Sequence, residues 1–89
     1  MTIYDTMRGA LHAGLFHLGY KDKEERAKIL PSITRGKIDV GEPHTEPITY
    51  YRLRNPDGIE AAFAIGRLPE GAGYDLWMID PIDGSPFRT

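Results

Sequence analysis

The C-terminal half of the chain alternates apolar and polar residues in the manner of β-strands. Three runs rich in β-branched and aromatic residues occupy positions 48–54, 59–66 and 74–80. Asn55-Pro56-Asp57-Gly58 separates the first two runs and has the composition of a type I turn followed by a glycine bulge. Gly71-Ala72-Gly73 separates the last two as a hairpin loop. The pattern predicts a three-stranded antiparallel meander.

The first turn also sets an expected register, and the register assigns side chains to two faces. We expect the turn to pair Arg54 with Ile59, and hence Tyr51 with Ala62, Tyr50 with Phe63 and Ile48 with Ile65. One face then carries Ile48, Tyr50, Ala61, Phe63 and Ile65, and the other carries Thr49, Tyr51, Leu53, Ala62 and Ala64. Both faces are partly apolar, so both are expected to be partly covered. The small side chains of the alanine face favour it as the site of a closely packed helix.

The N-terminal half has helical spacing. Apolar residues recur every three or four positions and predict a helix over residues 3–18, ended by Gly19. Gly14 and its small neighbours make one side of this helix thin enough to lie close against a sheet. Asp22 has the position of an N-cap for a second, covering helix over residues 23–30, which Pro31 ends.

The remaining segments lack a clear period. Residues 31–47 are interrupted by glycine and proline and are expected to form a long loop, in which only Lys37–Val40 could be a brief strand. Residues 82–89 are expected to form a tail. The chain is therefore predicted to be a single domain, 1–89, of the α+β class: two N-terminal helices followed by the meander, with the first helix packed on one sheet face.

Composition removes several classes of function. The chain has 11 basic and 13 acidic residues, a formal net charge of −2, and no cysteine. No disulfide framework or thiolate site is available, and the charge gives no drive toward nucleic acid or anionic membranes. The longest apolar region, Ala10–Leu18, is broken by polar residues and glycine and is far shorter than a bilayer span. We expect a cytoplasmic protein without membrane contact.

Catalytic and metal-binding patterns are weak. The only serines, Ser32 and Ser85, lie outside any nucleophile motif. His12 and His17 are expected to be surface or half-buried side chains, because they lie on different sides of the predicted helix. His44, flanked by Glu42 and Glu46, is the one candidate for zinc, but no second histidine is near. We therefore expect no enzyme and no cofactor; a small enzyme or a metal site centred on His44 is the weakest alternative.

Binding to another protein is the function that the sequence favours. Tyrosine, tryptophan and arginine dominate interface hot spots, and the predicted sheet concentrates them at Tyr50, Tyr51, Arg52, Arg54, Tyr74 and Trp77. We expect a non-catalytic module that binds a partner stoichiometrically through the sheet, in the manner of regulators or inhibitors encoded by phages and mobile elements. A homodimer through an edge strand or the face not covered by the first helix stays open.

Nucleic-acid binding is the alternative, through a basic hairpin that carries Arg52 and Arg54. It is less favoured because the same hairpin carries Asp57 and Glu60 and the net charge is negative.

Overall fold

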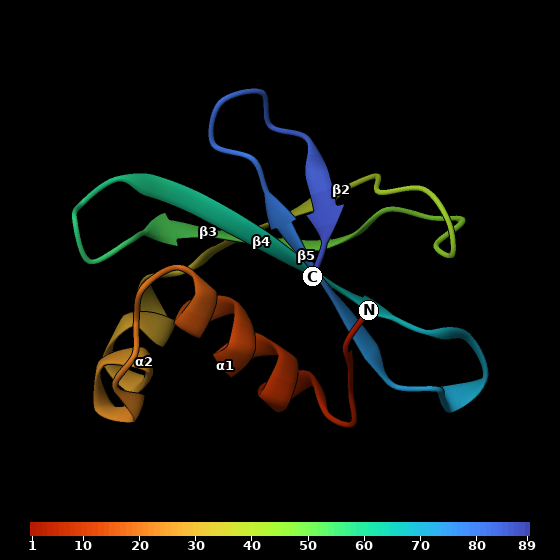
Figure 1. Ribbon diagram of the computed structural model, residues 1–89, viewed down its shortest axis with the longest axis horizontal. Coiled ribbons are helices and arrows are strands. Elements are labelled where there is room, and N and C mark those ends of the chain that lie inside the picture. The colour runs from red at the N-terminus through yellow and green to blue at the C-terminus, as the bar shows by residue number, and fades with distance from the viewer.

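The computed structural model describes residues 1–89 and shows an α+β fold, with two helices on one side of a six-stranded antiparallel sheet (Figure 1). The fold class and the packing of a helix on the sheet are as predicted. The elements, in chain order, are β1 (Ile3–Tyr4), α1 (Met7–His17), α2 (Lys23–Ile29), the 3-10 turn η1 (Leu30–Ser32), β2 (Thr34–Ile38), β3 (Ile48–Arg54), β4 (Glu60–Arg67), η2 (Pro69–Gly71), β5 (Tyr74–Ile79) and β6 (Pro86–Arg88). None of the helices has the length and apolar character needed to cross a membrane.

The prediction of three strands was incomplete. Strands β3, β4 and β5 form the expected meander, but β1, β2 and β6 add to it. β1 occupies residues assigned to the first helix, β2 lies within the predicted loop, and β6 lies within the predicted tail. These strands are too short to show a period of their own, and they form because the outer strands of the meander present unpaired backbone groups.

The helix caps explain where α1 and α2 begin. Thr6 caps α1, which begins four residues later than predicted, and its hydroxyl accepts a hydrogen bond from the Gly9 N–H. Asp22 caps α2 as expected and accepts from the Glu24 N–H. Gly19, with φ of 115°, follows the end of α1 as predicted.

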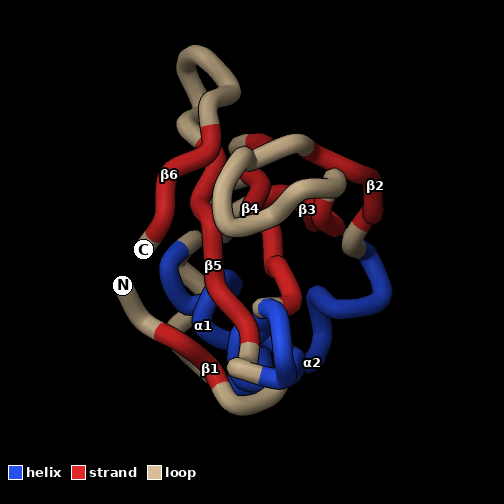
Figure 2. Tube along the Cα trace, turned by 90° about the vertical axis from the view of Figure 1, so that its right-hand side faces the viewer, coloured by secondary structure: helices blue, strands red, loops and turns tan.

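The strand order is β1-β5-β4-β3-β2, with β6 also paired to β5. β1 pairs with the first part of β5 and β6 with the last part, so these two strands share one edge (Figure 2). The Thr2 N–H donates to the Thr89 carbonyl at 3.3 Å, which joins the two ends of the chain beside β5. One edge of the sheet is therefore divided between two very short strands, and β2 forms the other edge as a single strand without an outer neighbour.

The predicted register was wrong by one residue, although the turn type was right. Gly58 has φ of 79°, and its N–H donates to the Asn55 carbonyl at 2.9 Å. Asn55 also donates to the Ile59 carbonyl at 2.8 Å, so Asn55 itself pairs with Ile59 and Arg54 pairs with Glu60. Side chains alternate between the two faces along a strand. The shift by one residue therefore places every side chain of β4 on the opposite face, relative to β3, from the one predicted.

The helices therefore cover the predicted face of β3, with Tyr51 and Leu53, but the face of β4 opposite to the one predicted, with Phe63 and Ile65 in place of Ala62 and Ala64. α1 packs on the face that carries the larger side chains, and the core there includes Leu15, Tyr51, Phe63, Ile65, Leu76 and Met78. Close approach comes from the helix, not from sheet alanines: a Cβ added to Gly14 would lie 2.4 Å from the Phe63 ring. The predicted thin side of the helix is thus confirmed at Gly14.

The second face has a core of its own. Ile48, Ala64 and Trp77 are buried there, and Ile38, Val40 and Tyr50 pack against them. The segment that joins β2 to β3 lies over this face and brings His44 against Gly66 in β4. Both faces are covered, as predicted, and it is the β2–β3 loop that covers the second.

Candidate functional site

The six residues predicted to bind a partner do not form one surface. The Tyr51 side chain stacks on Phe63 at 5.4 Å between ring centroids and is 1 % exposed, and Trp77 is 8 % exposed. Burial raises the pKa of the Tyr51 hydroxyl, an effect that the nearby Arg35 guanidinium partly opposes. Tyr74 is half-buried on the helix side of the sheet. Tyr51 and Trp77 therefore belong to the two cores, as expected for the aromatic residues of a small domain.

Tyr50 and the two arginines lie on the loop side of the sheet. The Tyr50 ring lies across the backbone of β2, where a Cβ on Gly36 would approach it to 2.2 Å. Arg52 and Arg54 are exposed and line a groove of about 440 Å³ beside the start of β2. The structure thus brings Arg52 and Arg54 together and separates them from Tyr51, Tyr74 and Trp77.

The open edge of the sheet carries unpaired backbone groups. Asn55 and Ile59 form a hydrogen-bonded pair, and such pairs alternate along an antiparallel ladder. Even-numbered residues of β3 therefore direct their backbone groups to β2, where their partners are Thr34, Gly36 and Ile38. It follows that the N–H and C=O groups of Arg35 and Lys37 point away from the sheet.

This edge is also basic. β2 contains Arg35 and Lys37 and no acidic residue. The Arg35 guanidinium lies 5.5 Å from the Tyr51 ring centroid, and the Lys37 Nζ donates to the Thr49 hydroxyl at 3.1 Å. Neither side chain forms an ion pair. The edge therefore combines free backbone donors and acceptors with uncompensated positive charge.

A buried polar cluster on the second face was missed in the sequence. Asp75 has no exposed surface, and both of its carboxylate oxygens contact His44 Nε2, at 2.8 and 2.9 Å. Arg88 from β6 approaches the same carboxylate at 3.6 Å and lies over the Trp77 ring at 4.8 Å. The signal was an aspartate inside the apolar run of β5, because a buried carboxylate requires a partner.

Gly66 makes room for this cluster. A Cβ at this position would lie 2.3 Å from the His44 ring and 2.6 Å from an Asp75 carboxylate oxygen. The His44 side chain is only 6 % exposed and borders an open cleft of about 450 Å³. The carboxylate beside His44 is thus Asp75 and not Glu42 or Glu46, and no group of three or more potential ligands surrounds a metal position. The arrangement fastens the β2–β3 connection to the sheet.

Comparisons with protein-family models, with curated proteins and with solved structures gave no match to this chain. The fold and its surfaces are therefore the basis for inferring function.

Proposed function

We propose that this protein is a small non-catalytic binding module that recognises an extended, acidic segment of another protein along β2. The observation that carries the proposal is the contrast between the two sheet edges: the edge beside β5 consists of two very short strands, β1 with 2 residues and β6 with 3, while β2 is one continuous, basic strand of 5 residues with no outer neighbour. An open edge strand is a template for pairing with an added strand.

The backbone of β2 supplies the attachment. Arg35 and Lys37 offer their outward N–H and C=O groups to an incoming strand, which pairs with them as a further strand of the sheet. Their side chains lie on the helix side of the sheet, beside Tyr51 and Thr49. Acidic side chains of the partner on that side would meet both cations, since opposite charges on neighbouring strands attract.

The arginine groove extends the same surface. Arg52 is the register partner of Thr34, the first residue of β2, and both line the groove. A partner chain that continues past Thr34 enters the groove and reaches Arg52 and Arg54. The nearest acidic group is Glu60, whose carboxylate is 3.8 Å from Arg52 Nε in an exposed pair. Exposed pairs of this kind are weak and exchange readily.

A second copy of the chain is a poorer occupant than an acidic partner. Antiparallel pairing of two β2 strands centred on Gly36 places Arg35 of one copy opposite Lys37 of the other. Like charges directly opposite one another destabilise a strand pair. The charge on β2 therefore favours a different, acidic chain over a homodimer at this edge.

The test uses two short peptides, one of alternating glutamate and valine and one of alternating lysine and valine. We expect the acidic peptide to shift the amide resonances of Thr34–Ile38 and to slow hydrogen exchange at Arg35 and Lys37, and the basic peptide to do neither. Reversing both charges, with Arg35→Glu and Lys37→Glu, should exchange the preference. Equal binding of both peptides, or perturbation confined to other elements, would overturn the proposal.

Backbone pairing is tested separately from charge. Lys37→Thr keeps the outward N–H and removes the charge, whereas Lys37→Pro also removes the N–H without breaking the ladder to β3. We expect the proline variant to bind the acidic peptide about tenfold more weakly than the threonine variant, a difference of about 1.4 kcal/mol. Equal affinities in two folded variants would exclude strand addition. Salt-sensitive binding to random DNA that exceeds peptide binding would instead favour the nucleic-acid alternative.

A further inference from the structure

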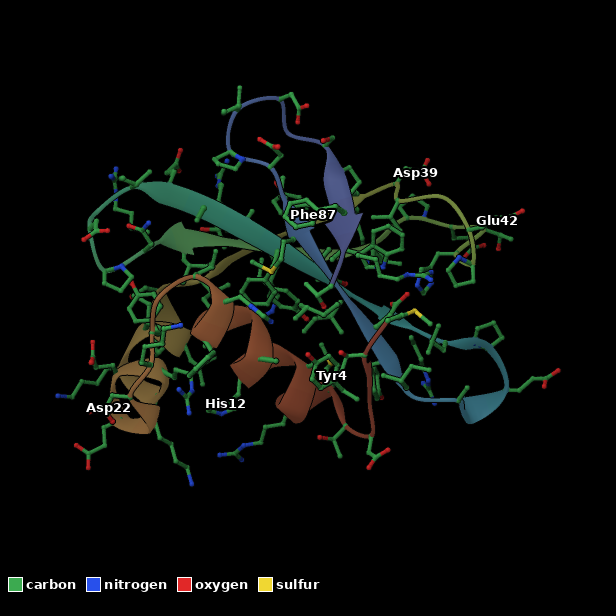
Figure 3. All side chains as sticks on the ribbon, in the orientation of Figure 1. Tyr4, His12, Asp22, Asp39, Glu42 and Phe87 are labelled. Carbon is green, nitrogen blue, oxygen red and sulfur yellow. The ribbon has the colours of Figure 1, made fainter.

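A polar hollow lies on the outer side of the two helices, away from the sheet. It has a volume of about 450 Å³, and no apolar residue lines it; its walls are Thr6, Arg8, Gly9, His12, Lys23 and Arg26. Figure 3 shows His12 on the side of α1 that is turned away from the strands. The hollow is separate from β2 and from the arginine groove.

Arg26 is held in this hollow by backbone and ring acceptors. Its Nε donates to His12 Nδ1 at 3.0 Å, and its Nη1 donates to the carbonyls of Tyr20 and Lys21 at 2.9 and 3.0 Å. No carboxylate takes part. The guanidinium is therefore fixed in place with its charge uncompensated and with Nη2 free to donate.

The contact with Arg26 also fixes the tautomer of His12. Because His12 Nδ1 accepts a hydrogen bond, the neutral ring carries its proton on Nε2, where it is a donor. Burial, followed by the positive charges of Arg26, Arg8 and Lys23, lowers the pKa of His12. All the charged groups that shift this pKa are cations.

The hollow concentrates positive charge in a chain that is negative overall. Arg8, Lys23 and Arg26 form no ion pair with a carboxylate, since the ion pairs of the structure involve only His44, Arg52 and Arg88. This concentration of unpaired cations occurs in a chain whose formal net charge is −2. Three cations and a histidine donor around one concave surface suit an anion with more than one negative charge and several acceptor oxygens.

We propose that this hollow binds a phosphomonoester group. Such a group carries nearly two negative charges near neutral pH and presents three acceptor oxygens. Arg26 and His12 line the hollow and are joined by a hydrogen bond that leaves Arg26 Nη2 and His12 Nε2 as donors without a partner, and Arg8 and Lys23 are exposed cations of the same lining. A carboxylate or a phosphodiester has a single charge and satisfies fewer of these groups.

The experiment titrates the protein with inorganic phosphate, glucose 6-phosphate and a phosphoserine peptide at constant ionic strength, with chloride as the reference anion. We expect saturable shifts at the His12 ring and at the amides of Arg8 and Lys23, and a higher His12 pKa in the complex because the bound anion favours the charged ring. A free sugar phosphate that binds as tightly as the peptide would identify a small metabolite as the source of the phosphate, and tighter binding of the peptide would identify a modified partner protein.

Matched variants make the test specific. The double variant Arg8→Ala with Lys23→Ala should weaken phosphomonoester binding at least about tenfold, while Lys28→Ala, which removes a cation of α2 outside the hollow, should leave it unchanged. Shifts reproduced by chloride, or undiminished binding by the folded double variant, would overturn the proposal. Tighter binding of a single-stranded oligonucleotide than of any phosphomonoester would also overturn it. The arms with inorganic phosphate and glucose 6-phosphate do not depend on peptide binding at β2.

Discussion

His44 Nε2 contacts both carboxylate oxygens of Asp75, at 2.8 and 2.9 Å, in a site where the aspartate has no exposed surface. The two residues are 31 positions apart, and their contact joins the β2–β3 connection to β5. The segment contributes few apolar side chains of its own to the second core. The His44–Asp75 contact therefore accounts for how a proline-rich loop covers a sheet face.

Removal of the His44 side chain should lower the free energy of unfolding. His44→Ala leaves Asp75 with only the longer contact to Arg88, and loss of one partner of a buried pair destabilises by about 3 kcal/mol. Urea unfolding monitored by Trp77 fluorescence measures the change. Thr45→Ala, an exposed neighbour in the same loop, is the control and should stay within about 0.5 kcal/mol. A loss below about 1 kcal/mol for His44→Ala would contradict a fastening role.

Gly66→Ala should destabilise through the same contact. The new Cβ would lie 2.3 Å from the His44 ring, and overpacking of this kind costs about 1–3 kcal/mol. The cost should shrink when His44→Ala is present, because the ring that meets the methyl group is gone. Unfolding free energies of the two single variants and the double variant measure this coupling. Strictly additive effects would show that the Gly66 position is limited by something other than His44.

Gly14→Ala tests how closely α1 packs on the sheet. Helix propensity and packing predict opposite effects of this substitution on stability. Helix propensity alone predicts a gain of about 0.5–1 kcal/mol. The structure predicts a loss of about 1–3 kcal/mol instead, because the methyl group would lie 2.4 Å from the Phe63 ring. Gly9→Ala is the matched control, since its Cβ meets only the Thr6 hydroxyl, at 3.2 Å. Thermal unfolding that ranks Gly14→Ala as the more stable variant would exclude the close packing.

Tyr51→Ala should behave as a core substitution. The side chain is 1 % exposed and stacked on Phe63, so its removal should cost about 3–5 kcal/mol. Arg52→Ala and Arg54→Ala, at exposed positions of the same strand, should each cost less than about 1 kcal/mol. Differential scanning calorimetry distinguishes the two groups. A Tyr51 variant as stable as the arginine variants would return this residue to the surface.

The pH dependence of stability should report His12. Its pKa in the folded protein lies below the ordinary value of 6.5, through burial and the cations Arg26, Arg8 and Lys23. As the pH falls below about 6.5, the unfolded chain takes up this proton before the folded protein does. The stability that depends on a neutral His12 is therefore fully present above that pH, and it is lost as the pH falls toward the pKa of His12 in the folded protein. The melting temperature of wild type should drop more than that of His12→Gln between pH 7 and pH 5, and parallel profiles would contradict the assignment.

Several features were predictable because they are local. The turn at Asn55–Gly58, the cap at Asp22 and the stop at Gly19 each depend on the conformational preferences of a few adjacent residues. The strands of the meander were predictable for the same reason, since alternation is visible within each run. The register was missed by one residue, because Asn55, which belongs to the turn, also pairs with Ile59.

The binding surface was less predictable. Tyr51 and Trp77 are residue types that are common in interfaces, but both are buried in the cores. Residue type alone does not distinguish an interface residue from a core residue. Arg52 and Arg54 were placed on one surface by sequence spacing alone. Arg35, Lys37 and the cations around His12 became candidates only when the open edge and the outer helix face were located.

By itself, the sequence determined the α+β class, the positions of the main helices and strands, and the presence of apolar residues on both sheet faces. The tertiary structure decided which face α1 covers, which strand forms the longer free edge and which group pairs with Asp75. The physical reason is range: turns, caps and alternation depend on neighbouring residues. The pairing of β1 and β6 with β5 and the His44–Asp75 contact instead join segments that are distant in the chain, and no local pattern records them.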